Sequence, residues 1–304
     1  MNQSVLLFEN NIDVIDFNRR PVDGINCTQT SMFREDLQPL LLKCFRRLFK
    51  FTTILTLGAW YKDGKHYDCA IIPDVFFNLN ILKILTDRKK ADRQILYYRN
   101  RIRQCDLENI EFAKKNGFVL ASYSLEDSND YQMNFVPQYW NKKIISGKST
   151  IVNNDVYFLG AVKNRYKQLI EIKNECELHG LLTKFQIVSK KPLPYTMKNS
   201  VKYTEVVSNI LSSKAIVDVV ADDNWGLTLR PLEALMSRKK LITNYTDIKK
   251  YDFYVSNADN IFIIGEDCWD KLNEFVNSPF TDCDTKLDHY DSECWLKKIA
   301  SLQN

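Results

Sequence analysis

The sequence lacks the residue patterns of a disulfide-rich, zinc-binding or membrane-spanning protein. Its eight cysteines include no C-x-x-C pair, and its three histidines lie far apart along the chain. Zinc sites need closely spaced ligand pairs, so no metal centre is predicted, and scattered cysteines are typical of buried apolar side chains in a reducing compartment. No stretch approaches the roughly 18 uncharged apolar residues of a membrane span, and the first residues have no basic segment typical of a signal peptide. We therefore expect a cytoplasmic protein.

The sequence also lacks a large excess of charge of either sign. A net charge of +4 on 304 residues does not amount to the basic face of a dedicated nucleic-acid-binding protein. We therefore expect no nucleic-acid partner. The length allows one large domain or two ordinary ones of about 150 residues each.

Short apolar runs alternate with longer amphipathic segments, and this alternation is typical of α/β proteins. The first half predicts strands at 4–9, 51–57, 68–74, 93–99 and 118–124 and helices at 36–50, 78–90 and 106–117. After an aperiodic segment at 137–155, the second half predicts strands at 156–161, 184–189, 215–221, 240–245 and 260–265 and helices at 164–180, 204–214, 229–239, 269–278 and 292–301. Strands that are apolar on both faces favour parallel sheets covered by helices.

These segments predict two α/β domains of similar size, residues 1–150 and 151–304. In open sheets of this kind, ligands bind outside the carboxyl ends of the strands, where loops lead into helices. The chemistry is therefore expected at the strand–helix junctions.

The first such junction of the second half is "FLGAVKNR". Gly160 ends a predicted strand, and Lys163 and Arg165 precede a predicted helix. A glycine lets the backbone approach a phosphate group closely, and the two cations can neutralise its charge. The alternative is a plain strand–turn–helix with solvated charges, which this segment taken alone favours.

The second junction is "DNWGLTLRPLEALMSRKK" at 223–240. A helix begins after Gly226, where free N–H groups and the helix dipole suit a diphosphate. Thr228 can donate a hydroxyl hydrogen bond, and Arg230 adds a forked cation. Glu233 would repel phosphate but can accept hydrogen bonds from the hydroxyls of a ribose. Alternatively, Glu233 only complements the helix dipole or pairs with Arg230 at i,i+3.

The segment around Gly226 resembles the donor-binding region of GT-B-fold glycosyltransferases, in which a glutamate follows a loop glycine by seven residues. The chain is more closely similar to bacterial lipopolysaccharide and capsule biosynthesis glycosyltransferases, through "YFLGAVKNR", "KYTEVVSNILSSKAIVDVV", "GLTLRPLEALMSRKKLITNYTDIKKYDFY" and "NIFIIG". A weaker likeness in "YDCAIIPD" and "ILYYRNRI" extends the resemblance over most of residues 65–300, and only the block 201–265 is specific.

The resemblance implies two Rossmann-like domains facing a cleft, with a C-terminal helix that can cross back to the first domain. A nucleotide-sugar donor would be bound by the C-terminal half and a glycan or lipid-linked glycan acceptor by the N-terminal half. The resemblance also implies a donor site that contains Gly160, Lys163, Arg165, Gly226, Leu227, Thr228, Arg230 and Glu233. In such a site the diphosphate would lie against Gly226, Thr228 and Arg230, and Glu233 would hold the ribose. Arg230 would also act in catalysis by stabilising the charge of the leaving group.

The stereochemical outcome of the reaction stays open. Many retaining enzymes of this fold have a second glutamate directly before the loop glycine, where this chain has Trp225. An inverting enzyme would need a general base in the first half. The candidate bases are Glu126, Asp127, Asp130 and Asp74, and the candidates for contact with the acceptor or the sugar phosphate are Asp74, Arg99 and Asn100. Each of the acids could instead be a solvated loop residue or a cap.

The segment with Asp282 and Asp284 has the D-x-D pattern with which metal-dependent transferases hold a divalent cation on the donor diphosphate. No predicted strand leads into this polar stretch, so we interpret it as a chance match. Arg230 and the helix N-terminus would do the work of a metal, and we expect neither a metal ion nor another cofactor.

The predicted helix at 36–50 combines Lys43, Arg46, Arg47 and Lys50 with a face rich in leucine and phenylalanine. It could rest on anionic lipid at the cytoplasmic face of the inner membrane, next to a membrane-anchored acceptor. Equally, it could be a core helix with a solvated basic face.

The first hypothesis is a cytoplasmic glycosyltransferase that moves a sugar from a nucleotide donor to a lipopolysaccharide, lipooligosaccharide or capsule glycan. The alternatives are a nucleotide-sugar epimerase on the same double-Rossmann framework and a non-catalytic glycan- or nucleotide-binding partner. The sequence alone names neither the sugar nor the linkage.

Overall fold

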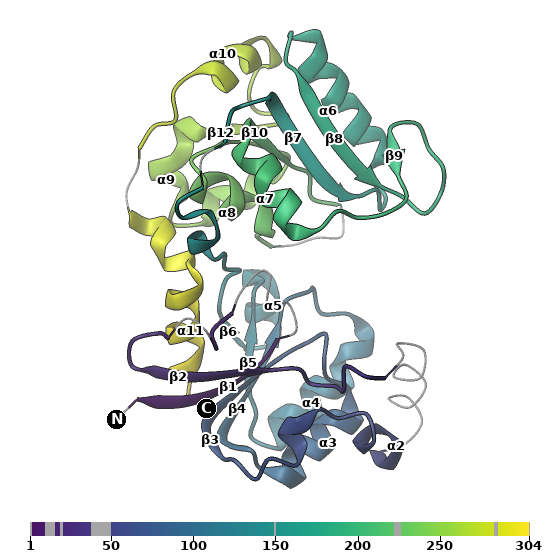
Figure 1. The fold of residues 1–304 in the computed structure, drawn as a ribbon, viewed down its shortest axis with the longest axis vertical. Helices are drawn as coiled ribbons and strands as arrows, with labels where there is room; N and C mark the ends of the chain where they lie inside the picture. The colour runs from purple at the N-terminus through teal and green to yellow at the C-terminus, as the bar shows by residue number, and fades with distance from the viewer. Residues whose placement is uncertain are drawn as a thin grey trace. The chain divides into compact units, whose positions relative to one another are not determined.

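The computed structural model describes residues 2–9, 16–18, 21–37, 50–148, 150–221, 226–282 and 285–303. The chain forms two compact units, which we call unit 1 (Met1–Pro137 and Glu293–Asn304) and unit 2 (Gln138–Ser292). Each unit is built on one parallel sheet (Figure 1). The last helix of the chain belongs to unit 1, so the C-terminal segment returns to the first unit as the sequence predicts.

Unit 1 contains a six-stranded parallel sheet in the order β2-β1-β3-β4-β5-β6. Its strands are β1 (Gln3–Phe8), β2 (Ile25–Thr30), β3 (Tyr67–Pro73), β4 (Ala91–Tyr98), β5 (Val119–Ser122) and β6 (Asn134–Phe135). Because β2 pairs with one side of β1 and β3 pairs with the other, the strand order reverses between β1 and β3.

Helices cover both faces of the sheet of unit 1. They are α2 (Lys50–Ile54), α3 (Leu79–Arg88), α4 (Leu107–Lys115), α5 (Leu125–Asp130) and α11 (Ser292–Ala300), with 3₁₀ turns η1 (Ala59–Tyr61) and η2 (Gln104–Asp106). On one face, α3 and α4 bury Ile81, Leu85 and Ile110 in the core. Successive side chains of a strand point to opposite faces, and on the other face the ring of Tyr97 lies 5.4 Å from that of Trp295 in α11.

Unit 2 contains a second parallel sheet, also of six strands, in the order β12-β11-β10-β7-β8-β9. Its strands are β7 (Asn154–Ala161), β8 (Thr183–Val188), β9 (Thr196–Met197), β10 (Ser213–Asp218), β11 (Lys240–Thr243) and β12 (Ile261–Ile263). Most residues of β7, β10, β11 and β12 are buried on both faces, which is the pattern of strands in a parallel sheet covered by helices.

The helices of unit 2 lie on both faces of this sheet. They are η3 (Lys142–Ile145), α6 (Tyr166–Leu178), α7 (Tyr203–Leu211), α8 (Leu229–Met236), η4 (Thr246–Lys250), α9 (Tyr254–Asn257), η5 (Ala258–Asn260), η6 (Trp269–Lys271), α10 (Leu272–Asn277) and η7 (Thr285–Tyr290). Figure 1 shows α6 running along β8. In the core, α6 and α10 bury Leu169, Ile172 and Val276 against Val156 and Val217 of the strands.

The fold class predicted from the sequence is confirmed, but some of the predicted helices and strands are wrong. The strand predicted at 51–57 is absent, because α2 occupies Lys50–Ile54; a short apolar run does not distinguish a buried helix from a strand. The polar edge strand β2 and the short helix α5 were not predicted. The helix predicted at 36–50 falls almost entirely on 38–49, outside the described residues. Among the helices that are described, none is both long enough and apolar enough to span a bilayer.

Candidate functional site

In unit 2 the strand order reverses between β7 and β10, because β8 pairs with one side of β7 and β10 with the other. Ligands of open α/β sheets bind at such a reversal, outside the carboxyl ends of the strands. The chain leaves β7 at Ala161 and enters α8 after β10. Polar side chains gather at this place. We call them the switch-point cluster, and they are Arg165, Asp218, Thr228, Arg230 and Glu233.

The guanidinium of Arg230 is held on two sides. It forms an ion pair with the carboxylate of Glu233, one turn further along α8, and its Nη2 donates a hydrogen bond to the carbonyl oxygen of Leu159 at 3.1 Å. The i,i+3 pair that the sequence left open as an alternative is therefore present. The side chain of Arg230 keeps 20% of its surface exposed, whereas that of Glu233 keeps 1%. The arginine is thus fixed against the end of β7 with part of its surface accessible.

A chain of hydrogen bonds continues behind Glu233. The hydroxyl of Tyr203, at the start of α7, donates to Glu233 Oε1 at 2.7 Å, and the indole N–H of Trp140 donates to the Tyr203 hydroxyl at 2.7 Å. Burial, followed by the charge of Glu233, raises the pKa of Tyr203 well above its ordinary value, so the hydroxyl stays protonated and donates. Both oxygens of Glu233 therefore have partners, and its contact with a ribose stays a prediction.

Asp218, at the end of β10, organises the start of α8. Its Oδ1 accepts a hydrogen bond from the hydroxyl of Thr228 at 2.9 Å. Burial raises the pKa of the Asp218 carboxyl, while the Thr228 bond and the charges of Arg165 and Arg230 act in the opposite direction. Thr228 is the N-cap residue of α8, yet its side chain makes no capping hydrogen bond. The first N–H groups of α8 are therefore not satisfied by their N-cap side chain.

Gly160 and Arg165 form the β7 side of the cluster. The guanidinium of Arg165 donates two hydrogen bonds to the carbonyl oxygen of Ala161, at 3.3 and 3.2 Å, and lies 5.6 Å from the ring centre of Phe158. A Cβ on Gly160 would lie 2.9 Å from both Arg165 Nη2 and the Phe158 ring, so the glycine makes room for the arginine. Burial lowers the pKa of Arg165, the charge of Asp218 opposes this, and the charge of Arg230 adds to it.

The remaining residues of the predicted donor site differ in accessibility. Lys163 is exposed in the turn after β7, at a left-handed φ of 41°. Gly226 and Leu227 are buried ahead of α8, where the Leu227 N–H donates to the hydroxyl of Tyr251 at 2.9 Å. Trp225, which stands where a second glutamate would favour retention, lies outside the described residues.

Unit 1 has its own cluster beside the reversal between β1 and β3. Glu9, directly after β1, forms an ion pair with Arg99, which follows β4. Asp74, directly after β3, accepts hydrogen bonds from the backbone N–H of Arg99 at 3.3 Å and from the side-chain amide of Asn100 at 2.9 Å. Burial raises the pKa of Asp74, and these two hydrogen bonds oppose the shift. The residues predicted to contact the acceptor or the sugar thus lie together.

The other predicted acid–base residues, Glu126, Asp127 and Asp130, lie in the short helix α5. The side chain of Ser124 caps α5 by accepting from the Asp127 N–H at 3.2 Å. Asp127 is buried and accepts from the Ile102 N–H at 3.1 Å, and burial raises its pKa. Glu126 accepts from the Ser124 hydroxyl at 3.1 Å, and Asp130 is exposed. Because α5 follows β5, these acids lie two strands away from the reversal between β1 and β3.

No group of three or more histidine, cysteine, aspartate or glutamate side chains could hold a metal ion within the described part of the chain. Of the D-x-D match, Asp282 accepts a hydrogen bond from Arg238 at 2.9 Å. Its partner in the pattern, Asp284, lies outside the described residues.

Four polar residues of these clusters were missed by sequence reasoning. Two carried a signal: Asp218 interrupts the apolar run "AIVDVVA", and Glu9 ends the apolar run "SVLLF". A carboxylate at the end of a buried strand indicates a paired or functional role. Tyr203 and Trp140 carried none, because Tyr203 meets a partner 30 residues away and Trp140 meets one 63 residues away.

Comparisons with known proteins give a match in structure. No protein-family model matches the chain, and no curated protein matches its sequence. The structure of UDP-GlcNAc 2-epimerase from Methanocaldococcus jannaschii matches with a TM-score of 0.52 and 12% identity, over 98% of this chain and 99% of that one. The chain has a GT-B-like fold. A structure of the M. jannaschii enzyme in complex with UDP-GlcNAc and UDP gives a TM-score of 0.45 and 13% identity, over 95% of this chain and 98% of that one.

We expect Asp218→Asn to change how stability depends on pH. Folding raises the pKa of Asp218 above its ordinary 3.8, so the folded chain binds this proton more tightly than the unfolded chain. The wild-type free energy of unfolding therefore loses a contribution as the pH rises above about 4, and asparagine avoids this loss. Urea denaturation at several pH values should show that the free energy of unfolding of the variant increases relative to that of the wild type as the pH rises. Asp282→Asn, at an exposed position, is the control, and a pH-independent difference would contradict the prediction.

Proposed function

We propose that this chain is a nucleotide-sugar enzyme that binds the diphosphate of its substrate at the switch-point cluster of unit 2. The observation that carries the proposal is the meeting of Arg165 and Arg230 at the carboxyl end of β7, where each donates to a β7 carbonyl oxygen. The N-terminus of α8 lies one residue before Arg230. Two guanidinium groups and the N–H groups of a helix N-terminus are donors that suit a diphosphate.

The residues of the cluster have different roles in this proposal. Arg165 and Arg230 bind the phosphate oxygens and balance their charge without a metal ion. Asp218 and Thr228 set the start of α8. Glu233 holds the guanidinium of Arg230 in place, and it is also the residue proposed to meet the hydroxyls of the ribose.

For the reaction, we propose epimerisation of a UDP-sugar as the first candidate. Its support is the likeness in fold to a UDP-GlcNAc 2-epimerase, which extends over almost the whole of both chains. The comparisons thereby support the epimerase alternative better than the first hypothesis from the sequence. Glycosyl transfer to a lipopolysaccharide or capsule glycan is the second candidate, and the seven-residue spacing from Gly226 to Glu233 supports it.

Epimerisation inverts one stereocentre, so it needs a group that takes a proton and one that returns it. Within unit 1 we propose Asp74 for acid–base work. It lies beside the reversal of strand order, and burial raises the pKa of its carboxyl group above the ordinary value, as is common for acid–base residues. Glu126, Asp127 and Asp130 are weaker candidates, because α5 lies away from that reversal.

We expect Arg165→Gln and Arg230→Lys each to weaken the binding of UDP by roughly 10- to 100-fold. A hydrogen bond to a charged group contributes about 1.5–3 kcal/mol, and lysine lacks the fork of arginine. Isothermal titration calorimetry measures the affinities, and circular dichroism checks the fold. Arg238→Gln, just after α8 and exposed, is the matched control. A wild-type protein that binds no UDP would refute the proposal.

The variant Glu233→Gln separates the two proposed roles of this carboxylate. We expect it to weaken the binding of UDP about tenfold more than the binding of inorganic pyrophosphate, because only UDP has a ribose whose hydroxyls lose a charged acceptor. Competition titrations with both ligands measure the ratio. Tyr203→Phe, which removes one hydrogen bond to Glu233 and keeps its charge, is the control. If the variant loses affinity for both ligands equally, the only remaining role of Glu233 is to position Arg230.

Proton NMR of the wild-type protein with UDP-GlcNAc tests the reaction itself. We expect the anomeric signals of a second UDP-sugar to grow without any added acceptor. We expect Asp74→Asn to abolish this change at unaltered affinity for UDP, because the residue acts on protons and not on the diphosphate. Release of UDP only after addition of a glycan acceptor would identify a glycosyltransferase. An unchanged substrate in both mixtures would identify a binding protein.

A further inference from the structure

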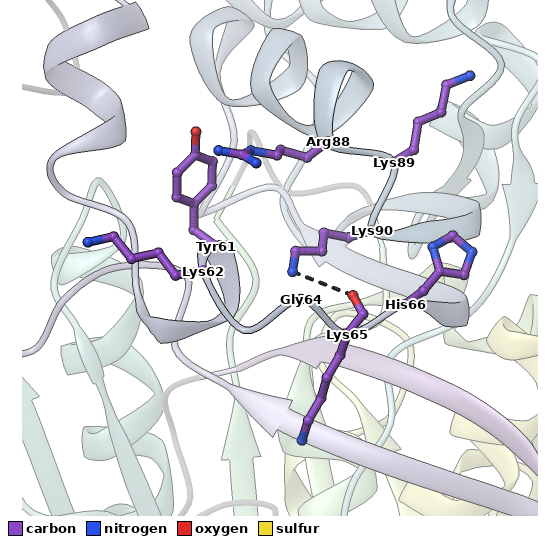
Figure 2. Close-up of a pocket in the computed structure, with 8 residues that line it drawn as sticks. All are labelled: Tyr61, Lys62, Gly64, Lys65, His66, Arg88, Lys89 and Lys90. Atoms are coloured by element: carbon purple, nitrogen blue, oxygen red, sulfur yellow. Dashed lines mark hydrogen bonds between the residues drawn. The ribbon is translucent and has the colours of Figure 1, made fainter.

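A second basic site lies in unit 1, at the amino ends of its strands. A pocket of about 430 Å³ is bounded by the segment before β3 and the segment before β4 (Figure 2). We call it the basic pocket, and its lining includes Tyr61, Lys62, Lys65, Arg88, Lys89 and Lys90. The switch-point cluster belongs to unit 2 and to carboxyl ends of strands, so the basic pocket is a separate site.

The two segments are held in defined conformations. Asp63 accepts a hydrogen bond from the Lys65 N–H at 3.1 Å, across Gly64 with its left-handed φ of 66°. Lys89 ends α3 with a left-handed φ of 45°. An ion pair of 2.6 Å between Lys90 Nζ and Asp63 Oδ1 joins the two segments, and the Lys90 side chain is only 8% exposed. The pocket is therefore formed before any ligand binds.

The cations around the pocket exceed their counter-charges. Asp63 neutralises Lys90, whereas the side chains of Lys62, Lys65 and Lys89 are exposed and form no ion pair with any described residue. Figure 2 shows Lys62 on one side of Lys90 and Lys89 on the other. In that view the side chains of Lys62, Lys65 and Lys89 extend outward in different directions. Lysine has a flexible stem with rotatable donors, so these exposed ammonium groups are able to turn toward an anion in the pocket.

Arg88 and Tyr61 add a preorganised donor to the pocket. The guanidinium of Arg88 lies 4.1 Å from the ring centre of Tyr61, a stacking that restricts the long side chain. His66 pairs with Asp92 at 2.8 Å, so that carboxylate is already engaged. The fork of Arg88 is thus held at the pocket wall without a carboxylate partner among the described residues.

The dipole of α3 explains only part of this charge. Cations in the last turn of a helix are stabilised by the partial negative charge of its C-terminus, and this applies to Arg88 and Lys89. Lys62 and Lys65 belong to the other segment, for which the dipole gives no reason. Their place on the lining of the same pocket as the end of α3 needs a different explanation.

We propose that the basic pocket binds a small ligand that carries at least two phosphate groups. Its volume of about 430 Å³ suits a small molecule, and lysine ammonium groups on two sides with a fixed arginine fork are phosphate donors. The phosphate groups can belong to a soluble metabolite or to the headgroup of a lipid. Both share the chemistry that the pocket recognises, and the experiment separates them.

The test uses two probes on the full chain. Inorganic tripolyphosphate is titrated by calorimetry. Vesicles of phosphatidylcholine with phosphatidylinositol 4-phosphate, whose headgroup carries two phosphate groups, are used in sedimentation. The variant pair is Lys62→Glu with Lys65→Glu, and the control pair is Lys115→Glu with Lys271→Glu, which changes the net charge equally at exposed positions. All proteins carry Arg165→Gln, so that the switch-point cluster contributes less to the binding of either probe.

We expect the variant pair to lose affinity by about tenfold or more and the control pair to stay within about twofold, because only the variant pair removes phosphate donors from the pocket. Binding of tripolyphosphate identifies a soluble ligand, and binding of vesicles alone identifies a lipid headgroup. In the otherwise wild-type chain, the variant pair should keep the wild-type affinity for UDP, so this test fails or succeeds independently of the proposed function. The proposal is overturned if neither probe binds or if both pairs lose affinity equally.

Discussion

The ion pair between Arg230 and Glu233 is the interaction on which the switch-point cluster depends. A buried carboxylate is costly unless it is paired and hydrogen-bonded, and Glu233 has Arg230 on one oxygen and Tyr203 on the other. In return, the guanidinium of Arg230 is fixed against the carbonyl group of Leu159. The entropy of ordering this long side chain is lost during folding, so a ligand that meets it does not bear that cost again.

The two units apply one arrangement with a different balance of charge. In each, the strand order reverses beside the first strand of the sheet, and a carboxylate lies at the end of a neighbouring strand or directly after it. In unit 2, Arg165 and Arg230 balance the carboxylates of Asp218 and Glu233, and the N-terminus of α8 adds N–H donors for an anion. In unit 1, Arg99 pairs with Glu9 through its side chain and donates its backbone N–H to Asp74, an arrangement that favours hydroxyl groups and proton exchange. The difference in charge follows from a few side chains on the same kind of framework.

The fold class could be predicted because alternating apolar and amphipathic segments are local signals. The strand predicted at 51–57 was wrong because an apolar run of that length does not distinguish a strand from a buried helix. The meeting of Gly160, Arg165 and Arg230 could also be predicted, since carboxyl ends of parallel strands share one edge. The burial of Glu233 could not. It depends on how α7 packs beside α8 and brings Tyr203 to the carboxylate, which is a tertiary contact without a sequence pattern.

Trp140 also ties together the two ends of unit 2. Its backbone N–H donates to the Tyr290 carbonyl oxygen at 2.9 Å, and its backbone carbonyl oxygen accepts from the Ser292 N–H at 3.1 Å. Unit 2 is therefore an insertion into unit 1, entered and left at neighbouring points. During synthesis, the ribosome completes unit 2 before it makes α11, so the unit that begins second is finished first. Unit 1 has to wait for α11 before Trp295 can pack on Tyr97.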